Sequence, residues 1–191
     1  MENYLGSEQC SCGREHNVAI DDVVVGKGVL ARLPEFVNAY GAKKPFVLAD
    51  RNTYKAAGEQ VLQILRNNGI DYSTYIFQKD SLEPSEEAVG SAVMHFDPSC
   101  VLIIGVGSGV INDIAKILSN ISGKPYIIVG TAPSTDGYAS ASSSMTRDGL
   151  KISLPSRSAD VIIGDTDILC QAPLHMMKAG LGDMIAKYVS I

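Results

Sequence analysis

The amino-acid sequence predicts an α/β protein whose core is a doubly wound, mainly parallel β-sheet. Short β-branched runs alternate along the chain with stretches of helical periodicity, which is the pattern of strands joined by crossover helices. The run at 100–104 is apolar at each position, as expected for a strand that helices cover on both faces. The 191 residues suffice for one domain with a substantial core, or for one domain and part of another.

Each predicted element rests on a local pattern. The helix at 54–68 has an apolar face, and Asn52 or Thr53 is placed to cap its start. Two short runs, 142–145 and 151–154, flank Arg147-Asp148-Gly149 and predict a hairpin. The expected strands are 22–25, 45–50, 72–77, 100–104, 125–129 and 159–163, and the expected helices are 29–40, 54–68, 85–95, 110–119 and one from Pro173 onward.

The helix that begins at Pro173 predicts a second domain. Nothing follows this helix that could cover its apolar positions. We therefore expect a nucleotide-binding α/β domain at 1–170, and at 171–191 the first helix of a truncated, all-helical domain. A natural C-terminal helix is the alternative. If the second domain is missing, the face left exposed favours association of the chain.

Composition excludes several classes of function. The formal net charge is −5 and no basic stripe is present, which excludes a general nucleic-acid binder. No apolar run approaches about 18 residues, so no membrane span is expected. The first eight residues are polar and acidic, unlike a secretory signal. The four cysteines are too few for a disulfide framework, which favours a reducing compartment, and we expect the cytoplasm.

A glycine-rich run follows the predicted strand at 100–104. In Gly105–Gly109 the order is G-x-G-x-G, and glycines before a helix let a backbone approach phosphates at the helix N-terminus. The usual dinucleotide fingerprint is G-x-G-x-x-G after the first strand, whereas this run follows roughly the fourth. A plain tight turn is the alternative. In the helix that follows, Asp113 could complement the dipole, and Lys116 could be solvated or pack beside the sheet.

A second polar loop follows the strand at 125–129. It offers hydroxyls from Thr131, Ser134 and Ser140 and a carboxylate from Asp136. Loops at the carboxyl ends of neighbouring parallel strands are where such sheets bind ligands. An Asp-Gly turn with capping serines explains the same residues without a ligand.

Three motifs together resemble a known family. The segments GVGSGVINDIAK, TAPSTDGYAS and AGLGDMIAKY occur in the order found in glycerol-1-phosphate dehydrogenases, and the bacterial branch is the most similar. That group belongs to the iron-containing alcohol dehydrogenase and dehydroquinate synthase superfamily, whose nucleotide-binding domain is Rossmann-like. The resemblance covers residues 10–191, and its specificity lies in the combination of the three motifs.

The resemblance implies binding roles for individual residues. Asp136 would contact the substrate, and Asp183 would be a catalytic residue that binds both a divalent metal and the substrate. Asp50 would hold the adenosine ribose and so favour NAD over NADP, although capping of the next helix explains it equally. The residues expected to contact NAD or NADP are Asp50, Gly109, Val110, Ile111, Asn112, Asp113, Thr131, Ala132, Pro133, Ser134 and Ser140.

This sequence departs from the family's pattern of metal ligands. Family members hold Zn, Ni or Fe with one Asp and two His, and neither His16, His95 nor His175 falls in a matching motif. We therefore expect one metal ligand here and no catalysis by this chain alone. Cys10 and Cys12 with His16 suggest a separate metal trio, but three ligands without a fourth favour a turn instead.

The resemblance implies hydride transfer between NAD(P)H and dihydroxyacetone phosphate, with sn-glycerol 1-phosphate as the reduced product. A bound metal would acidify the alcohol as a Lewis acid. A dehydroquinate-synthase-like lyase, a glycerol or long-chain alcohol dehydrogenase, and a nucleotide-binding module without catalysis are the alternatives. The expected partners are a small phosphorylated polyol or ketone and further copies of the chain in a homodimer or larger oligomer, with no nucleic acid and no membrane.

Overall fold

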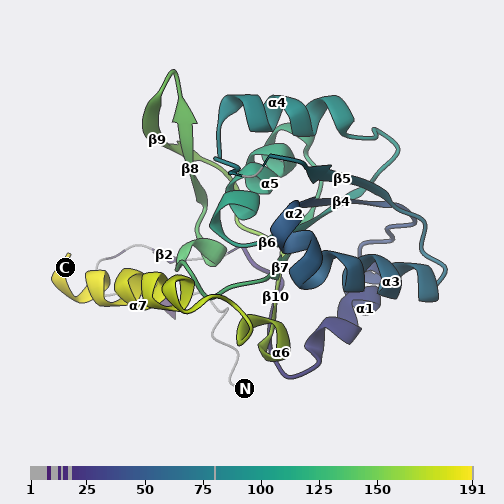
Figure 1. Ribbon diagram of the computed structural model, residues 1–191, viewed down its shortest axis with the longest axis horizontal. Helices are drawn as coiled ribbons and strands as arrows, with labels where there is room; N and C mark the ends of the chain where they lie inside the picture. The colour runs from purple at the N-terminus through teal and green to yellow at the C-terminus, as the bar shows by residue number, and fades with distance from the viewer. Residues whose placement is uncertain (1–7, 10–12, 14, 17–18, 80, 191) are drawn as a thin grey trace.

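The computed structural model describes residues 8–9, 13, 15–16, 19–79 and 81–190 (Figure 1). Its centre is a six-stranded sheet in the order β3-β10-β7-β6-β4-β5, and each neighbouring pair is parallel. The strands are β3 (Asp22–Gly26), β4 (Pro45–Asp50), β5 (Ser73–Phe77), β6 (Leu102–Gly107), β7 (Tyr126–Gly130) and β10 (Val161–Asp165). The predicted doubly wound parallel sheet is confirmed.

Helices cover both faces of this sheet. In Figure 1, α4 and α5 lie on one face, and α1 and α3 lie on the other. The helices are η1 (Val29–Arg32), α1 (Leu33–Ala39), α2 (Arg51–Thr53), η2 (Tyr54–Gly58), α3 (Glu59–Asn67), α4 (Glu86–His95), α5 (Gly109–Ser122), η3 (Gly137–Ala139), α6 (Thr166–Leu169) and α7 (Leu174–Val189). Two short antiparallel pairs complete the fold: β1 (Glu8–Gln9) with β2 (Glu15–His16), and β8 (Ser142–Arg147) with β9 (Leu150–Pro155).

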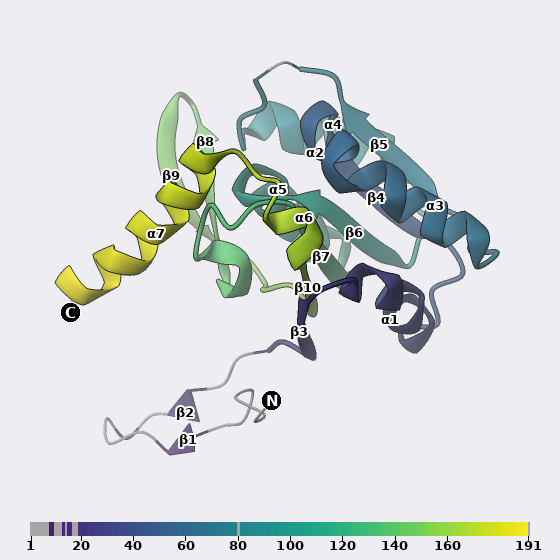
Figure 2. The same ribbon diagram turned by 60° about the horizontal axis from the view of Figure 1, so that its bottom comes forward.

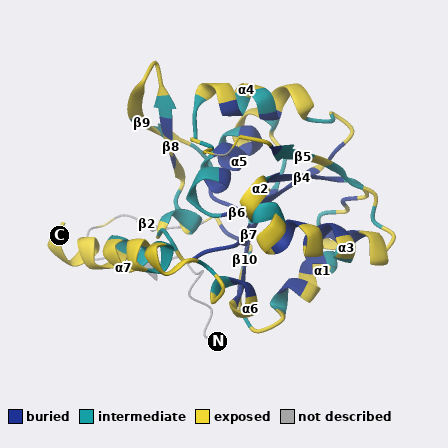
Figure 3. Cartoon of the chain, in the orientation of Figure 1, coloured by how far each residue is buried: buried dark blue, intermediate teal, exposed yellow. Residues whose placement is uncertain are grey.

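Two apolar cores form because the central strands are buried on both faces. Along β4, Val47 and Ala49 pack into the core under α1 and α3, whereas Phe46 and Leu48 pack into the core under α4 and α5. All six residues of β6 are buried. Because alternate side chains enter apolar cores on both faces, the central strands lack the polar positions of a half-exposed sheet. Figure 3 shows the central strands buried and the outer helix faces exposed.

Several boundaries differ from the sequence prediction. The helix expected at 29–40 begins as a 3-10 helix, and the one expected at 54–68 begins at Arg51 and passes through a π-helical turn. The strand expected to end at Ile104 continues to Gly107, so the predicted break at Gly105 is wrong. The short α6 was not predicted. The β8–β9 hairpin is confirmed, because Asp148 and Gly149 adopt φ of 51° and 76°, as a type I′ turn requires.

Helix α7 lies apart from the cores. None of its residues is buried, and Figure 2 shows it extending away from the sheet. A mainly apolar cavity of about 420 Å³ lies where its first turns meet the loop after β7, with Met177, Leu181 and Met184 in its wall. Among the described residues, no helix has the length and apolar character needed to cross a bilayer.

Candidate cofactor cavity and the acidic pair beside it

A cavity of about 700 Å³, the switch-point cavity, opens at the carboxyl ends of β4 and β6. The chain leaves β4 toward β5 on one side and leaves β6 toward β7 on the other, so these neighbours form the point where strand order reverses. Ligands of open α/β sheets bind outside the strand ends at that point. The wall consists of Asp50, Asn52, Thr53, Lys55, Ala56, Lys79, Ser81, Leu82, Ser108, Val110, Ile111, Thr131, Ala132, Ile168, Gln171, Ala172, Pro173, His175 and Met176.

The unusual place of the glycine run follows from this topology. Without the edge strand β3, the sheet order in chain numbering is 2-1-3-4-5, the flavodoxin-like arrangement. In that arrangement the reversal lies between the first and third strands, which here are β4 and β6. The glycine run follows β6, so it borders the cavity although it comes late in the sequence.

The N-terminus of α5 faces the cavity. Ser108 is its N-cap, and the Ser108 side chain makes no capping hydrogen bond. The first intrahelical bond is donated by the Asn112 N–H to the Ser108 oxygen at 2.9 Å, so the amides at 109–111 precede the hydrogen-bonded ladder. Ser108, Val110 and Ile111 all line the cavity. Such a helix end, with its dipole behind it, binds anionic groups.

The glycines are required for close packing rather than for a turn. A Cβ on Gly107 would lie 2.5 Å from the Ile111 Cβ, and a Cβ on Gly105 would lie 2.8 Å from the Tyr126 hydroxyl. Neither residue has a positive φ. At Gly109 the nearest atom to an added Cβ is Thr135 Cγ2 at 3.8 Å, which is ordinary contact. Gly107 therefore lets β6 and α5 approach closely, Gly105 makes room for the Tyr126 side chain of β7, and Gly109 has room.

Asp50 combines a capping role with a place in the cavity wall. Its Oδ1 accepts the N–H groups of Asn52 at 2.8 Å and Thr53 at 2.9 Å, and Thr53 Oγ1 accepts the Asp50 N–H at 3.0 Å. This reciprocal pair is a capping box. The expectation that Asn52 or Thr53 caps the helix is wrong, because Asp50 does so. The ribose contact of Asp50 stays a prediction.

The loop after β7 divides into two parts. Thr131 and Ala132 line the cavity, and the Thr131 N–H donates to the Gly107 oxygen at 3.0 Å. Pro133 instead faces α7, where a Cβ on Gly180 would lie 2.0 Å from the Pro133 oxygen. The cavity wall thus includes five of the predicted cofactor residues, namely Asp50, Val110, Ile111, Thr131 and Ala132, and omits Gly109, Asn112, Asp113, Pro133, Ser134 and Ser140.

Three of the omitted residues make other contacts. The Asn112 amide donates to the Gly137 oxygen at 3.1 Å, and the Ser140 hydroxyl lies 2.9 Å from that of Ser142. Asp113 is largely buried, and burial raises its pKa to about 6 despite the nearby Lys116 ammonium. Lys116 is fully buried, so the solvated alternative is wrong, and burial lowers its pKa. The cofactor contacts of these residues stay predictions.

Asp136 and Asp183 lie together although 47 residues separate them. The Asp136 N–H donates to Asp183 Oδ2 at 3.4 Å, and Lys187 Nζ lies 2.7 Å from Asp136 Oδ2. This hydrogen bond with Asp136 raises the pKa of Lys187. The sequence analysis missed Lys187. Its position four residues after Asp183 on a predicted helix would have indicated a shared face.

The described residues do not by themselves fit a divalent metal. Among them, no three His, Cys, Asp or Glu side chains gather as a metal ion requires. Asp183 is one candidate ligand, and the carboxylate beside it is already paired with Lys187. His175 lines the large cavity, and His95 stacks on Tyr75. Cys10 and Cys12 lie outside the described residues, so their suggested metal trio stays untested.

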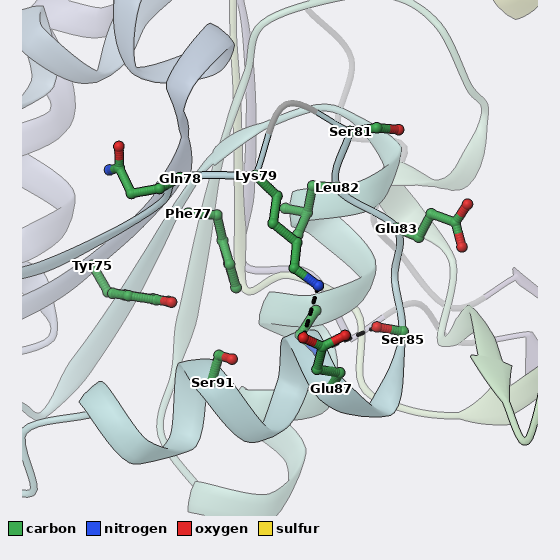
Figure 4. A pocket seen from close by; sticks show the side chains of 11 residues that line it. Tyr75, Phe77, Gln78, Lys79, Ser81, Leu82, Glu83, Ser85, Glu87 and Ser91 are labelled. Atoms are coloured by element: carbon green, nitrogen blue, oxygen red, sulfur yellow. Dashed lines mark hydrogen bonds and ion pairs between the residues drawn. The ribbon is translucent and has the colours of Figure 1, made fainter.

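A second cavity, of about 520 Å³, lies between β5 and α4. Its wall shares Lys79, Ser81 and Leu82 with the larger cavity, so this segment borders both. Figure 4 shows the Lys79 ammonium turned toward Glu87, to which it is bonded at 2.7 Å. The ion pair therefore links the segment after β5 to α4.

Comparison with known proteins identifies the family. A family model described as iron-containing alcohol dehydrogenase matches residues 24–173. The chain belongs to the iron-containing alcohol dehydrogenase family. The fold and the motif resemblance of the sequence analysis are thereby confirmed.

Two curated relatives of this family member carry the same name. The chain is 35% identical to glycerol-1-phosphate dehydrogenase [NAD(P)+] of Halalkalibacterium halodurans over 97% of its own length and 47% of the relative. It is 32% identical to the enzyme of the same name from Geobacillus thermodenitrificans, over 100% of its length and 48% of the relative. The chain thus spans about half the length of the curated relatives it matches.

Solved structures agree with this family. Glycerol dehydrogenase from Schizosaccharomyces pombe superposes with a TM-score of 0.79 at 27% identity, covering 89% of this chain and 43% of that one. The NADH-dependent butanol dehydrogenase A of Thermotoga maritima gives a TM-score of 0.75 at 20% identity, over 90% and 48% of the two chains. At that identity the second likeness concerns the fold alone.

Proposed function

We propose that the protein carrying this chain is a glycerol-1-phosphate dehydrogenase, which transfers hydride between NAD(P)H and dihydroxyacetone phosphate. The observation that carries the proposal is the cavity at the β4–β6 reversal, into which the uncapped N-terminus of α5 opens. Relatives at 35% and 32% identity bear that name. Assembly into a homodimer or larger oligomer and a cytoplasmic location stay predictions.

The residues of this chain bind and orient the dinucleotide. The amides at 109–111 would receive the pyrophosphate at the start of α5, where the helix dipole favours negative charge. Asp50, at the end of β4, would hold the adenosine ribose, and its charge would disfavour a 2′-phosphate. Thr131 and Ala132 form the wall on the β7 side.

The substrate lies between two parts of the whole protein. We assign residues 1–170 to the nucleotide-binding domain and 171–191 to the first helix of a second, helical domain. Two observations support this: no residue of α7 is buried, and the relatives are about twice as long as the chain. Asp136 and Asp183 face each other across this boundary and would contact the phosphorylated ketone.

A divalent metal is part of the proposal only through Asp183. The family is described as iron-containing, and Zn, Ni or Fe would supply a Lewis acid to the substrate oxygen. Since a metal ion needs about four ligands, the others would have to come from residues other than those described.

The test uses the product of the complete reading frame that contains these residues. With Zn²⁺ or Ni²⁺ added, we expect NADH oxidation that depends on dihydroxyacetone phosphate and exceeds the rate with glycerol, dihydroxyacetone or butanal. Preference for dihydroxyacetone would favour a glycerol dehydrogenase, the name of the similar yeast structure. NAD binding in calorimetry without turnover of any of these compounds would favour the module without catalysis, and refute the proposal.

A further inference from the structure

Lys116 is a buried charge that the proposed cofactor site does not use. Its side chain is fully buried in the second turn of α5, outside the wall of the switch-point cavity. A buried ammonium is costly unless hydrogen-bond acceptors replace its water. The hydrogen-bond partners of Lys116 therefore indicate its structural role.

Those partners are the two ends of one segment. Lys116 Nζ donates to the Gly137 oxygen at 2.7 Å and to the Ser142 oxygen at 3.1 Å, and Asp113 Oδ1 lies at 3.9 Å. The Asn112 amide adds a second bond to the Gly137 oxygen, at 3.1 Å. One side chain thus ties the start of η3 and the start of β8 to the same helix.

Asn112 is itself held in place. Its Oδ1 accepts a hydrogen bond from the buried Tyr126 hydroxyl at 3.1 Å, which fixes the orientation of the amide. The donors to Gly137 therefore project from one rigid helix, braced by β7. A short segment such as η3, with three residues, has few bonds of its own. Its position depends on contacts with other elements, namely the bonds from Lys116 and Asn112 and those of the Tyr138 hydroxyl to the oxygens of Ala132 at 2.7 Å and Gly107 at 3.4 Å.

The segment that Lys116 holds carries Asp136. Asp136 directly precedes Gly137, and on its other side it contacts Asp183 and Lys187 of α7. We propose that Lys116 is a positioning residue, which fixes the Gly137–Ser142 segment to helix α5 so that Asp136 stays beside Asp183. The inference rests on the proposed function, in which Asp136 contacts the substrate.

The first experiment is a double-mutant cycle in the complete gene product. Lys116→Met should raise KM for dihydroxyacetone phosphate by about 10-fold to 100-fold, the usual cost of a slightly misplaced group, and should raise the Kd for NADH much less. In the Asp136→Ala background, Lys116→Met should have almost no further effect on KM. Additive effects of the two substitutions, or an equal loss of NADH affinity, would overturn the proposal.

A matched control lies on the same helix. Ser119 is also fully buried and donates to the Lys124 oxygen at 2.6 Å, at the end of α5 remote from Asp136. Ser119→Ala should lower thermal stability without changing KM. If Ser119→Ala raises KM as Lys116→Met does, the effect of Lys116 is general destabilisation and the proposal fails.

The second experiment needs no turnover. In Lys116→Gln, which keeps a shorter donor and is suited to folding where Met fails, amide hydrogen exchange should accelerate at residues 137–142 and stay unchanged in β6. Unchanged exchange at 137–142 would refute the positioning role. If dihydroxyacetone phosphate is not a substrate, the proposed function fails alone, since the exchange result still decides whether Lys116 holds the segment.

Discussion

The Asp136 N–H lies 3.4 Å from Asp183 Oδ2, which joins the loop after β7 to helix α7. The two residues were expected at one site because of a motif resemblance, and the structure brings them together from elements 47 residues apart. The bond uses one carboxylate oxygen of Asp183. Because Asp136 takes part through its backbone N–H, its side-chain carboxylate pairs with Lys187.

Asp183→Asn tests whether the charge of Asp183 matters beyond this bond. The amide oxygen still accepts the Asp136 N–H, but a neutral amide is a poor ligand for a divalent ion. In the complete gene product we expect kcat to fall by about 100-fold or more, with bound metal lost in elemental analysis. Asp167→Asn, an exposed carboxylate near Lys27, is the control. Activity close to wild type would remove Asp183 from the site.

Gly180→Ala should loosen α7 from the loop after β7. A Cβ at residue 180 would lie 2.0 Å from the Pro133 oxygen, a backbone atom that cannot rotate away. We expect a loss of about 1–3 kcal/mol, or undocking of α7 seen as faster proteolysis there. Gly182→Ala is the matched control, because no atom lies within 4 Å of its added Cβ. That variant should gain up to about 1 kcal/mol from helix propensity.

The strands were the most predictable part of the sequence. β4 was predicted with its observed bounds, Pro45–Asp50, because the apolar run 45–49 lies between Lys44 and the charged Asp50. The glycine run was misjudged, because G-x-G-x-G is compatible with a turn and equally with a strand that packs closely on a helix. Only the distances from Gly107 to Ile111 decide between the two.

Long-range contacts limit how much of the site could be predicted from the sequence. The sequence left Lys116 either solvated or packed beside the sheet, because its acceptors, the oxygens of Gly137 and Ser142, are backbone atoms more than 20 residues away that no sequence pattern encodes. Asp50 was ambiguous for a related reason, since a capping carboxylate and a ribose-binding carboxylate occupy the same position after a strand. The motifs placed the right loops together, and the structure decided which side chains face the cavity.

Gly107→Ala and Gly109→Ala should separate packing from cofactor binding. The first places a Cβ 2.5 Å from that of Ile111 and should lower stability by about 1–3 kcal/mol or more. The second meets only Thr135 Cγ2 at 3.8 Å, so the fold should be kept. If the start of α5 holds the pyrophosphate, Gly109→Val should nevertheless weaken NAD binding in calorimetry. Unchanged affinity would make the glycine run purely structural.

Asp50→Asn should change the choice between the two dinucleotides. Asn is as good an N-cap as Asp, so the bonds to the N–H groups of Asn52 and Thr53 should survive. Loss of the charge should raise the affinity for NADP relative to NAD by roughly tenfold, about 1.4 kcal/mol. Asp50→Ala loses the cap too, and should lower stability by about 1 kcal/mol. An unaltered ratio of the two Kd values in Asp50→Asn would place the ribose elsewhere.

Asp113 should make stability depend on pH in the acid range. Burial raises its folded-state pKa to about 6, against the lowering effects of Lys116, Lys151 and the Ser144 N–H. The unfolded value is near 4, so the folded state takes up a proton first as pH falls from about 6 to about 4. Asp113 therefore destabilises the fold above pH 6, by at most about 3 kcal/mol, and this cost disappears near pH 4.

Asp113→Asn removes that titration. The free energy of unfolding of the variant, minus that of the wild type, should be larger at pH 8 than at pH 4. Denaturant unfolding at steps between these values measures the difference, with the exposed Glu59→Gln as a control for the change in net charge. The Asn side chain also loses the attraction of Lys116, which lies 3.9 Å away, so the difference at one pH is less informative than its slope. A slope of zero would mean that Asp113 titrates alike in the folded and unfolded states.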